Sequence, residues 1–339
     1  MNSNTPDIPS SLESVCYYYG IPSEPSVVAR SSAELWVEPR GPESYLTANE
    51  LKPVGPHALL DAQVAFTSVD PGRIGYVGSD FSPVIIWVGV VSGSLSGAKG
   101  VKVAVGCRAI LMDHGTTLRG QSQLSKSFSA RSHKTGDPRP ITPSATPPPP
   151  SFWFRRRAGS TNFVGNCIDL GTSVSVEEFT SWMHPHPTNS PSFEYPGNRL
   201  DFFGLIPDEQ MAKHNNKVLD NDKDSGIMSV KRGGASGLTV GRLNTLRSIV
   251  RHYFEGKPSQ SSREAAIYPR NSNSGASSEP GDSGTAVIDG KGRVAGILIG
   301  GAGTTESFDC TYVTSINFII KCLQEHGYEP DIFPTASYL

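Results

Sequence analysis

Apolar and polar positions alternate differently in the two halves of the chain. Residues Ser82–Leu95 (SPVIIWVGVVSGSL) form a β-branched run bounded by turn residues, which predicts a buried strand. In Gly97–Gly115 apolar residues recur three or four positions apart, which predicts a helix that ends at Gly115. We expect this strand and helix to form a small α/β unit. The predicted apolar face of the helix consists of Val101, Val105, Ala109 and Met112.

Two other segments of the first half lack such patterns. Residues 1 to about 80 are interrupted by Pro, Ser and Gly, so we expect irregular, partly ordered structure there. In residues 121–160 the apolar pattern stops, and the segment contains the proline tract TPSATPPPP and three consecutive arginines. This composition predicts an extended linker. The chain is therefore divided into an N-terminal extension, residues 1–120, a linker, residues 121–160, and a C-terminal part, residues 161–339.

In the second half, short apolar stretches recur between Gly, Pro, Asn and Asp turns. This spacing is typical of an antiparallel barrel or sandwich. The residues IDGKGRVAGILI predict a hairpin that turns at residues 289–292. Apolar residues at helical spacing in Ile316–Leu323 predict a helix that is capped by Thr314 or Ser315 and ends at Gly327.

Composition narrows the classes of function. The formal net charge of -2 and the pI near 6.5 give no electrostatic reason to expect nucleic acid or an acidic membrane as a partner. No apolar run approaches the ~20 residues of a membrane-spanning helix, and the first residues lack the pattern of a signal peptide. The five cysteines are scattered and form no CxxC pair, which favours reduced thiols and an intracellular, cytoplasmic protein. No cofactor is predicted, and no metal, because His184 and His186 have no third ligand nearby.

The stretch EPGDSGTAVIDGKGRVAGILIGG, residues 279–301, carries the strongest chemical signal. Gly281 lets the backbone turn its N–H inward, so that this N–H and the N–H of Ser283 can bind a developing oxyanion. Gly284 leaves the serine hydroxyl uncrowded, and the sequence ILIGGAG offers an edge for an extended substrate. Because Gly-Asp-Ser-Gly is also an ordinary hairpin turn, the four residues alone leave both interpretations open.

Several motifs in the same order resemble trypsin-like (chymotrypsin-fold) serine proteases. The order is a GDSG loop, a hairpin, the strand CTYVTSI and a terminal helix. More closely, NFVGNCIDLGT, FEYPGNRL, IPDEQM and SVKRGGASGLTVGR resemble a group of fungal trypsin-like proteins, and PVIIWVGVVSGSL resembles their N-terminal extension. The resemblance implies a mainly β fold with some α. The C-terminal antiparallel β-barrel would be retained, the first barrel truncated, and a small N-terminal α/β region added.

The resemblance also implies roles for individual residues. Ser283 would be the nucleophile of a serine endopeptidase, the amides of Gly281 and Ser283 its oxyanion hole, and Asp282 a structural carboxylate. Ser277 would lie at the base of the substrate pocket and would favour an uncharged, bulky side chain of a peptide or protein substrate. The wall of this pocket would consist of Gly300, Gly301 and Gly303.

The general base and the acid that this fold takes from its first barrel are not recognisable. In the family both would lie between the proline-rich segment and NFVGN, an interval that SFWFRRRAGS occupies here. His133, in SARSHKTG, is a candidate base because its sequence separation from Ser283 is close to the one that the fold uses. We therefore expect a catalytically impaired homologue. The alternatives are an active hydrolase that uses His133 and a non-enzymatic interaction module that binds through the barrel and the proline tract.

Overall fold

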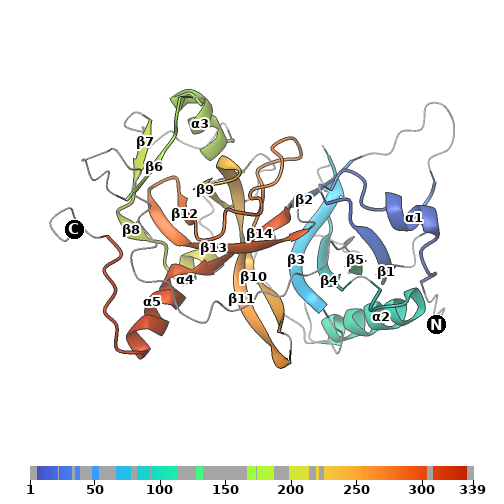
Figure 1. Cartoon of the computed structure of the whole chain (residues 1–339). Helices are drawn as coiled ribbons and strands as arrows, with labels where there is room; N and C mark the ends of the chain where they lie inside the picture. Colours follow the sequence, from blue (N-terminus) through green and yellow to red (C-terminus); the bar gives the residue numbers. More distant parts are fainter. Residues whose placement is uncertain are drawn as a thin grey trace.

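The structure is a computed structural model, and its described part is mostly β-sheet with few helices (Figure 1). The described residues are 6–21, 23–32, 35–38, 48–52, 66–77, 82–91, 93–113, 127–132, 166–172, 174–186, 198–213, 219–220, 225–254, 256–303 and 308–333. Twelve strands join in one sheet, and two further strands form a small sheet of their own.

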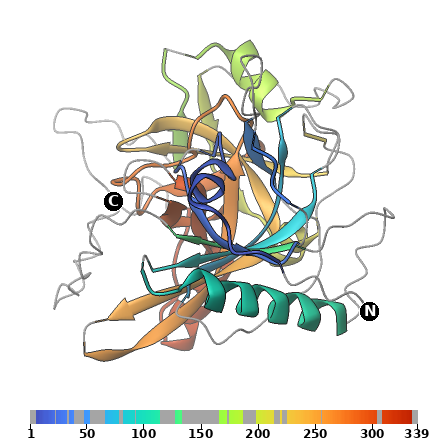
Figure 2. The same ribbon diagram turned by 90° about the vertical axis from the view of Figure 1, so that its right-hand side faces the viewer.

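The N-terminal half contributes five strands to the large sheet. β4 pairs in parallel with β5, and the other pairings among these strands are antiparallel. Helix α2 lies along this part of the sheet (Figure 2), and its buried Ala104 and Cys107 pack with apolar residues of β3 and β4. The elements are α1 (Ser11–Cys16), β1 (Ser26–Arg30), β2 (Asn49–Lys52), β3 (Phe66–Tyr76), β4 (Val84–Val90), α2 (Gly97–Asp113) and β5 (Ser127–Ser132).

Three expectations for this half need correction. Residues 1–80 contain α1 and strands β1 to β3, which the sequence pattern did not predict; Pro71 and Gly72 lie inside β3 and hid its pattern. The predicted helix is present and Val101 is buried as predicted, but Val105 is 39% exposed and Ala109 is exposed, so the buried face runs through Val101, Ala104 and Cys107. Residues 127–132 of the predicted linker form a strand, and the rest of residues 121–160 lies outside the described part.

In the C-terminal half, six antiparallel strands pair in a closed ring. Following the pairings, β9 is joined to β10, then to β11, β14, β13 and β12, and β12 pairs with β9 again. The predicted hairpin is formed by β12 and β13. The strands are β9 (Ile227–Gly233), β10 (Gly237–Phe254), β11 (Lys257–Pro269), β12 (Ala286–Asp289), β13 (Arg293–Gly303) and β14 (Phe308–Ser315).

The remaining elements flank the ring. Helix α5 (Ile316–Glu325) follows β14. It ends near Gly327 as predicted, and the N–H of Gly327 donates to the carbonyl of Gln324. Ser315 is at its N-cap position, but the hydroxyl of Ser315 donates to Asp208 instead of capping the helix. None of the described helices has the length and apolar character needed to cross a membrane. The other flanking elements are β6 (Cys167–Asp169), α3 (Val176–Met183), β7 (Arg199–Asp201), β8 (Gly204–Leu205) and α4 (Asp208–Ala212).

The interior of the ring is apolar in one part and polar in another. Alternate residues of a strand face opposite sides, so each ring strand presents one set of side chains inward. Leu243, Ile267, Val287, Leu298 and Val313, from five of the strands, pack in one buried cluster. A neighbouring small cavity is instead lined largely by polar residues, among them Ser229, Lys231, Thr239, Ser277 and Thr311.

Buried polar contacts join the N-terminal strands to the ring. β3 continues the sheet through only two residue pairs with β10. The hydroxyl of Tyr312 on β14 donates to Asp70 on β3 over 2.8 Å, and Asp70 is 0% exposed. Ser23 donates its N–H and its hydroxyl to the buried Asp309. Arg242 donates to the carbonyl of Leu51 over 2.8 Å. The division into extension, linker and C-terminal part stays a prediction, but the two halves share one sheet.

We predict that Tyr312→Phe destabilises the protein by about 1–3 kcal/mol, because the buried Asp70 carboxylate loses a donor. The free energy of unfolding in urea measures this. The matched control is Tyr328→Phe, since Tyr328 is 64% exposed, and it should change stability by less than about 0.5 kcal/mol. Equal effects of the two substitutions would contradict the role given to the Tyr312 hydroxyl.

Candidate functional site

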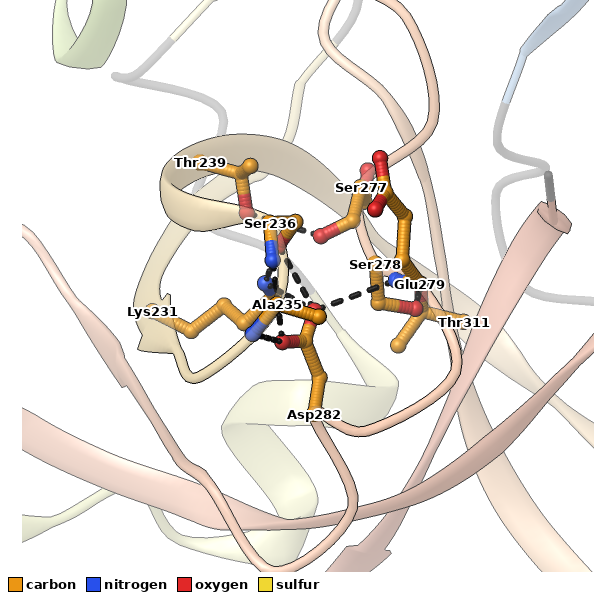
Figure 3. A network of polar contacts seen from close by, with 9 residues as sticks. All are labelled: Lys231, Ala235, Ser236, Thr239, Ser277, Ser278, Glu279, Asp282 and Thr311. Atoms are coloured by element: carbon orange, nitrogen blue, oxygen red, sulfur yellow. Dashed lines mark hydrogen bonds and ion pairs between the residues drawn. The ribbon is translucent and has the colours of Figure 1, made fainter. Parts of the chain in front are cut away.

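The loop between β11 and β12 carries Ser283, and one buried carboxylate holds it in place (Figure 3). Asp282 is 1% exposed and accepts hydrogen bonds from two side chains and three backbone N–H groups. Lys231 Nζ donates over 2.7 Å and Ser236 Oγ over 2.6 Å. The N–H groups belong to Ala235, Ser236 and Glu279, at 2.9, 3.2 and 3.0 Å. Asp282 thus ties the Ser283 loop to the turn between β9 and β10.

Sequence and local geometry make room for this carboxylate. Lys231 lines the small cavity inside the ring, and its neighbour Val230 on β9 borders the same cavity and packs in an apolar cluster with Val240 and Ile288. A Cβ at Gly233 would overlap the carboxylate of Asp282, so the close approach requires glycine at position 233. Lys231 Nζ also contacts Ser236 Oγ, which closes a three-membered polar cluster.

Lys231 and Asp282 each favour the charged form of the other, whereas burial favours the neutral form of both. Burial alone would raise the pKa of Asp282, but the hydrogen bonds from Lys231, Ser236 and the backbone outweigh it and hold this pKa well below its usual range. Burial lowers the pKa of Lys231, and the Asp282 carboxylate opposes that shift. At neutral pH Asp282 is therefore ionised, and its charge is satisfied within the protein.

The backbone around Ser283 leaves two N–H groups open. Gly281 has φ +106° and Gly284 has φ +90°, conformations that favour glycine. The N–H of Gly284 donates to the carbonyl of Leu298, whereas those of Gly281 and Ser283 have no acceptor among the described residues. Ser283 is exposed, and its Oγ lies 3.5 Å from the carbonyl oxygen of Ile299. The arrangement can therefore present two amide donors beside an accessible hydroxyl.

The predicted pocket residues fall on two neighbouring segments. Ser277 is 5% exposed, and its Oγ has no hydrogen-bond partner. Gly300, Gly301 and Gly303 lie on β13, where each pairs with β14. The opposite edge of β13 pairs with β12 only up to Ile297, so its glycine-rich end has no second strand among the described residues. The space on the side-chain side of Gly300 is open.

No described histidine forms a hydrogen bond with Ser283. His133, the candidate base, lies outside the described residues. His184 follows α3, and burial, followed by the charge of Lys291, lowers its pKa. His252 Nε2 lies 3.4 Å from Ser262 Oγ, and His326 contacts the carbonyl of Cys322. The described part of the chain therefore provides Ser283 with no base through a hydrogen bond.

Sequence reasoning missed Lys231 and Ser236. Both lie in SVKRGGASGLTVGR, a segment that entered the sequence analysis only through the resemblance to trypsin-like proteins. Lys231 lies between Val230 and Arg232 in a run of four buried residues, Met228 to Lys231, so the polar and apolar pattern of β9 gave no sign that this lysine is buried. A buried lysine requires a carboxylate partner, but the sequence alone does not say which one.

Known proteins offer distant comparisons. No model of a protein family matches the chain, and no curated protein does. Among solved structures, a glutamic acid-specific serine protease matches with TM-score 0.25 and 19% identity over 39% of this chain and 55% of its own. Cellulomonas bogoriensis chymotrypsin matches with TM-score 0.25 and 24% identity over 39% of this chain and 56% of its own. A protease from M. tuberculosis in its active form matches with TM-score 0.24 and 18% identity over 42% of this chain and 53% of its own.

The chain thus spans about half the length of the solved structures that it matches. These structures are serine proteases, but TM-scores near 0.25 are too low to decide the fold or the activity of this chain. Any assignment of function has to rest on the residues around Ser283.

We predict that Lys231→Met lowers the free energy of unfolding by about 3–5 kcal/mol, because Asp282 is left buried without its cation. Urea unfolding at neutral pH measures the change. The control is Lys321→Met, since Lys321 is exposed and lies 3.9 Å from Glu325; its effect should stay below about 0.5 kcal/mol. A loss of less than about 1 kcal/mol for Lys231→Met would show that the ion pair does not hold the loop.

A second prediction concerns acid. The pKa of Asp282 is lowered in the folded protein, so its ionised form contributes stability that is present above the unfolded pKa of about 4 and is lost as the pH falls toward the folded pKa. Ser236→Ala removes one donor and brings the folded pKa closer to the unfolded one. We expect the free energy of unfolding to fall less steeply between about pH 4 and pH 2 in this variant than in the wild type. Parallel curves would contradict the assignment.

Proposed function

We propose that the chain is a homologue of trypsin-like serine proteases that retains the Ser283 loop and binds extended polypeptide but hydrolyses it poorly. The observation that supports this most is the Asp282 network, beside which the N–H groups of Gly281 and Ser283 have no acceptor among the described residues and the Ser283 hydroxyl is exposed. In this proposal Ser283 is the nucleophile, the two amides are the oxyanion hole and Asp282 is structural.

The closed ring of six strands is the counterpart of the C-terminal barrel in this proposal, and the first barrel is truncated. Leu298 is bonded to Gly284 and Thr285, and the edge of β13 beyond Leu298 would take an extended peptide as an added strand. Ser277 would lie at the base of the substrate pocket, with Gly300, Gly301 and Gly303 along its wall. Glycines favour close approach of a peptide backbone, and the space on the side-chain side of Gly300 is open among the described residues.

In this proposal poor hydrolysis follows because Ser283 has no hydrogen-bonded base within the described part of the chain. A serine hydroxyl is weakly nucleophilic at neutral pH unless a positioned base takes its proton as the bond forms. An oxyanion hole and substrate binding without the triad leave a residual advantage of roughly 10³–10⁴ over water. Because no described histidine forms a hydrogen bond with Ser283, the chain would retain only this residual part.

Two alternatives differ from this proposal in a measurable way. An active hydrolase would need a base such as His133, and a pure interaction module would bind peptides without using the Ser283 hydroxyl. Reactive probes separate the three. A fluorophosphonate reports an activated serine, whereas a peptide boronic acid reports a serine hydroxyl beside a formed oxyanion hole.

We predict negligible fluorophosphonate labelling of the purified chain and no change in peptide hydrolysis on Ser283→Ala, because the hydroxyl lacks a base. A peptide boronic acid should still form a reversible adduct with the wild type, detected by mass spectrometry, and none with Ser283→Ala. Rapid stoichiometric labelling would favour the active enzyme, and its loss in His133→Ala would identify the base. Peptide binding that Ser283→Ala leaves unchanged, without any boronate adduct, would favour the interaction module.

A further inference from the structure

The hairpin of β10 and β11 extends beyond the rest of the ring, and none of the roles proposed above uses it. In Figures 1 and 2 its orange strands project from the body of the molecule. β10 pairs with β3 no further than Val250, and β11 pairs with β14 only from Ala265 onward. Among the described residues, positions 251–263 thus pair only with one another, and we call these positions the arm.

The base of the arm is braced against β3. The hydroxyl of Tyr253 donates to the carbonyl of Phe66 over 2.9 Å. The guanidinium carbon of Arg251 lies 4.0 Å from the centre of the Phe66 ring. Arg251 Nε also lies 3.4 Å from Ser261 Oγ on the other strand of the hairpin. These contacts fix the arm against β3, so a partner would meet a preformed surface.

The arm is basic, although the formal net charge of the whole chain is -2. Three of the four charged residues in positions 251–263 are basic, namely Arg251, Lys257 and Arg263, and the fourth, Glu255, lies outside the described residues. Lys257 and Arg263 are exposed, and neither has an ion pair with a described residue. Arg251 contacts an aromatic ring and a hydroxyl but no described carboxylate. The described part of the chain therefore leaves the positive charge of the arm uncompensated.

One backbone edge of the arm is also unused. Residues 257–263 of β11 are mostly exposed, and no described strand pairs with their edge that faces away from β10. β14 pairs with β11 only at residues 265–267 and ends at Ser315, where α5 begins. The backbone groups of such an edge can pair with another extended chain. Pro258 has no N–H, so the usable edge begins at Ser259.

The charges and the unused edge are arranged so that one ligand can use both. Arg251 is directly opposite Ser261, and Arg263 is two positions from Ser261 on β11, so these three side chains share one face of the arm. A strand added beside β11 would place every second side chain on this face. Acidic side chains at alternate positions would then lie near the two arginines, and opposite charges on neighbouring strands stabilise a sheet.

We propose that the arm docks an acidic, extended segment of another protein, which adds as a strand to β11 beyond Pro258. The carboxylates of the segment pair with Arg251 and Arg263, and its backbone pairs with the edge. A nucleic acid would also be attracted by the arginines, but it has no peptide groups for the edge, and the negative net charge of the chain opposes a polyanion. The proposal does not use the Ser283 loop, so it is independent of the proposed function.

The test measures how a fluorescein-labelled peptide amide, Thr-Glu-Val-Glu-Val-Glu-Thr, binds the full chain by anisotropy. We expect it to bind about five-fold more tightly than the same peptide with glutamine in place of each glutamate, as for two cross-strand charge pairs. Added salt should reduce this difference. Two further versions carry N-methyl groups, one on the glutamates and one on the valines. Amides of alternate residues point to opposite edges of a strand, so one version should lose binding and the other should keep it.

Arg263→Gln should reduce the advantage of the glutamate peptide to about two-fold, because one of the two charge pairs is lost. The control Arg199→Gln makes the same change at an exposed arginine of β7, which lies on the opposite side of the molecule from the arm in Figure 1, and should keep the advantage. Because the side chain of Arg263 has no ion pair with a described residue, the thermal midpoint of Arg263→Gln should equal that of the wild type. Hydrogen-exchange mass spectrometry of the complex should show new protection in residues 257–264.

Each part of the proposal has an outcome that overturns it. Equal binding of the glutamate and glutamine peptides overturns the selection of an acidic segment, and equal binding of the two N-methylated versions overturns the added strand. Protection at residues 298–303 of β13, with none in the arm, contradicts this proposal and favours the proposed function alone. An oligodeoxythymidine that displaces the peptide and binds more tightly overturns the choice of a protein partner. If the glutamate peptide does not bind, the arm does not dock such a segment.

Discussion

The buried ion pair between Lys231 and Asp282 is the interaction on which the Ser283 loop depends. Each charge alone would be very costly inside the ring, so the two residues have to be placed together. The remaining oxygen capacity of Asp282 is filled by Ser236 and by backbone N–H groups from two segments. A pair satisfied in this way fixes the backbone of Glu279 to Ser283 relative to β9, far more narrowly than apolar packing would.

Buried carboxylates also hold the N-terminal strands against the ring. The sheet passes between the halves through two residue pairs only, which leaves the angle between β3 and β10 loosely defined. Asp70 and Asp309 remove that freedom, because each is buried and each accepts hydrogen bonds from a residue of the other half, Asp70 from Tyr312 and Asp309 from Ser23. Buried polar groups of this kind contribute little net stability but strongly penalise any other docking geometry.

The sequence predicted those elements whose signals are local. Turn residues within a few positions predicted the hairpin of β12 and β13. Helical spacing and a glycine predicted the end of α5 at Gly327. β11 was missed because its first seven residues, KPSQSSR, are polar and mostly exposed, and only its last six residues are buried. The face of α2 was misassigned because Val105 is apolar but exposed, and only the position of the sheet decides which side is covered.

The same distinction explains the candidate site. Gly281, Asp282 and Ser283 are contiguous, so their pattern was visible, whereas Lys231 pairs with Asp282 across 51 positions and left no local sign. Nothing in the Asp282 network involves a histidine: its donors are a lysine, a serine and backbone amides. The forces that shape an oxyanion hole are thus separate from those that would activate the hydroxyl. A chain can therefore keep an oxyanion hole while it lacks the base that activates the hydroxyl, because loss of that base removes no contact that holds the loop.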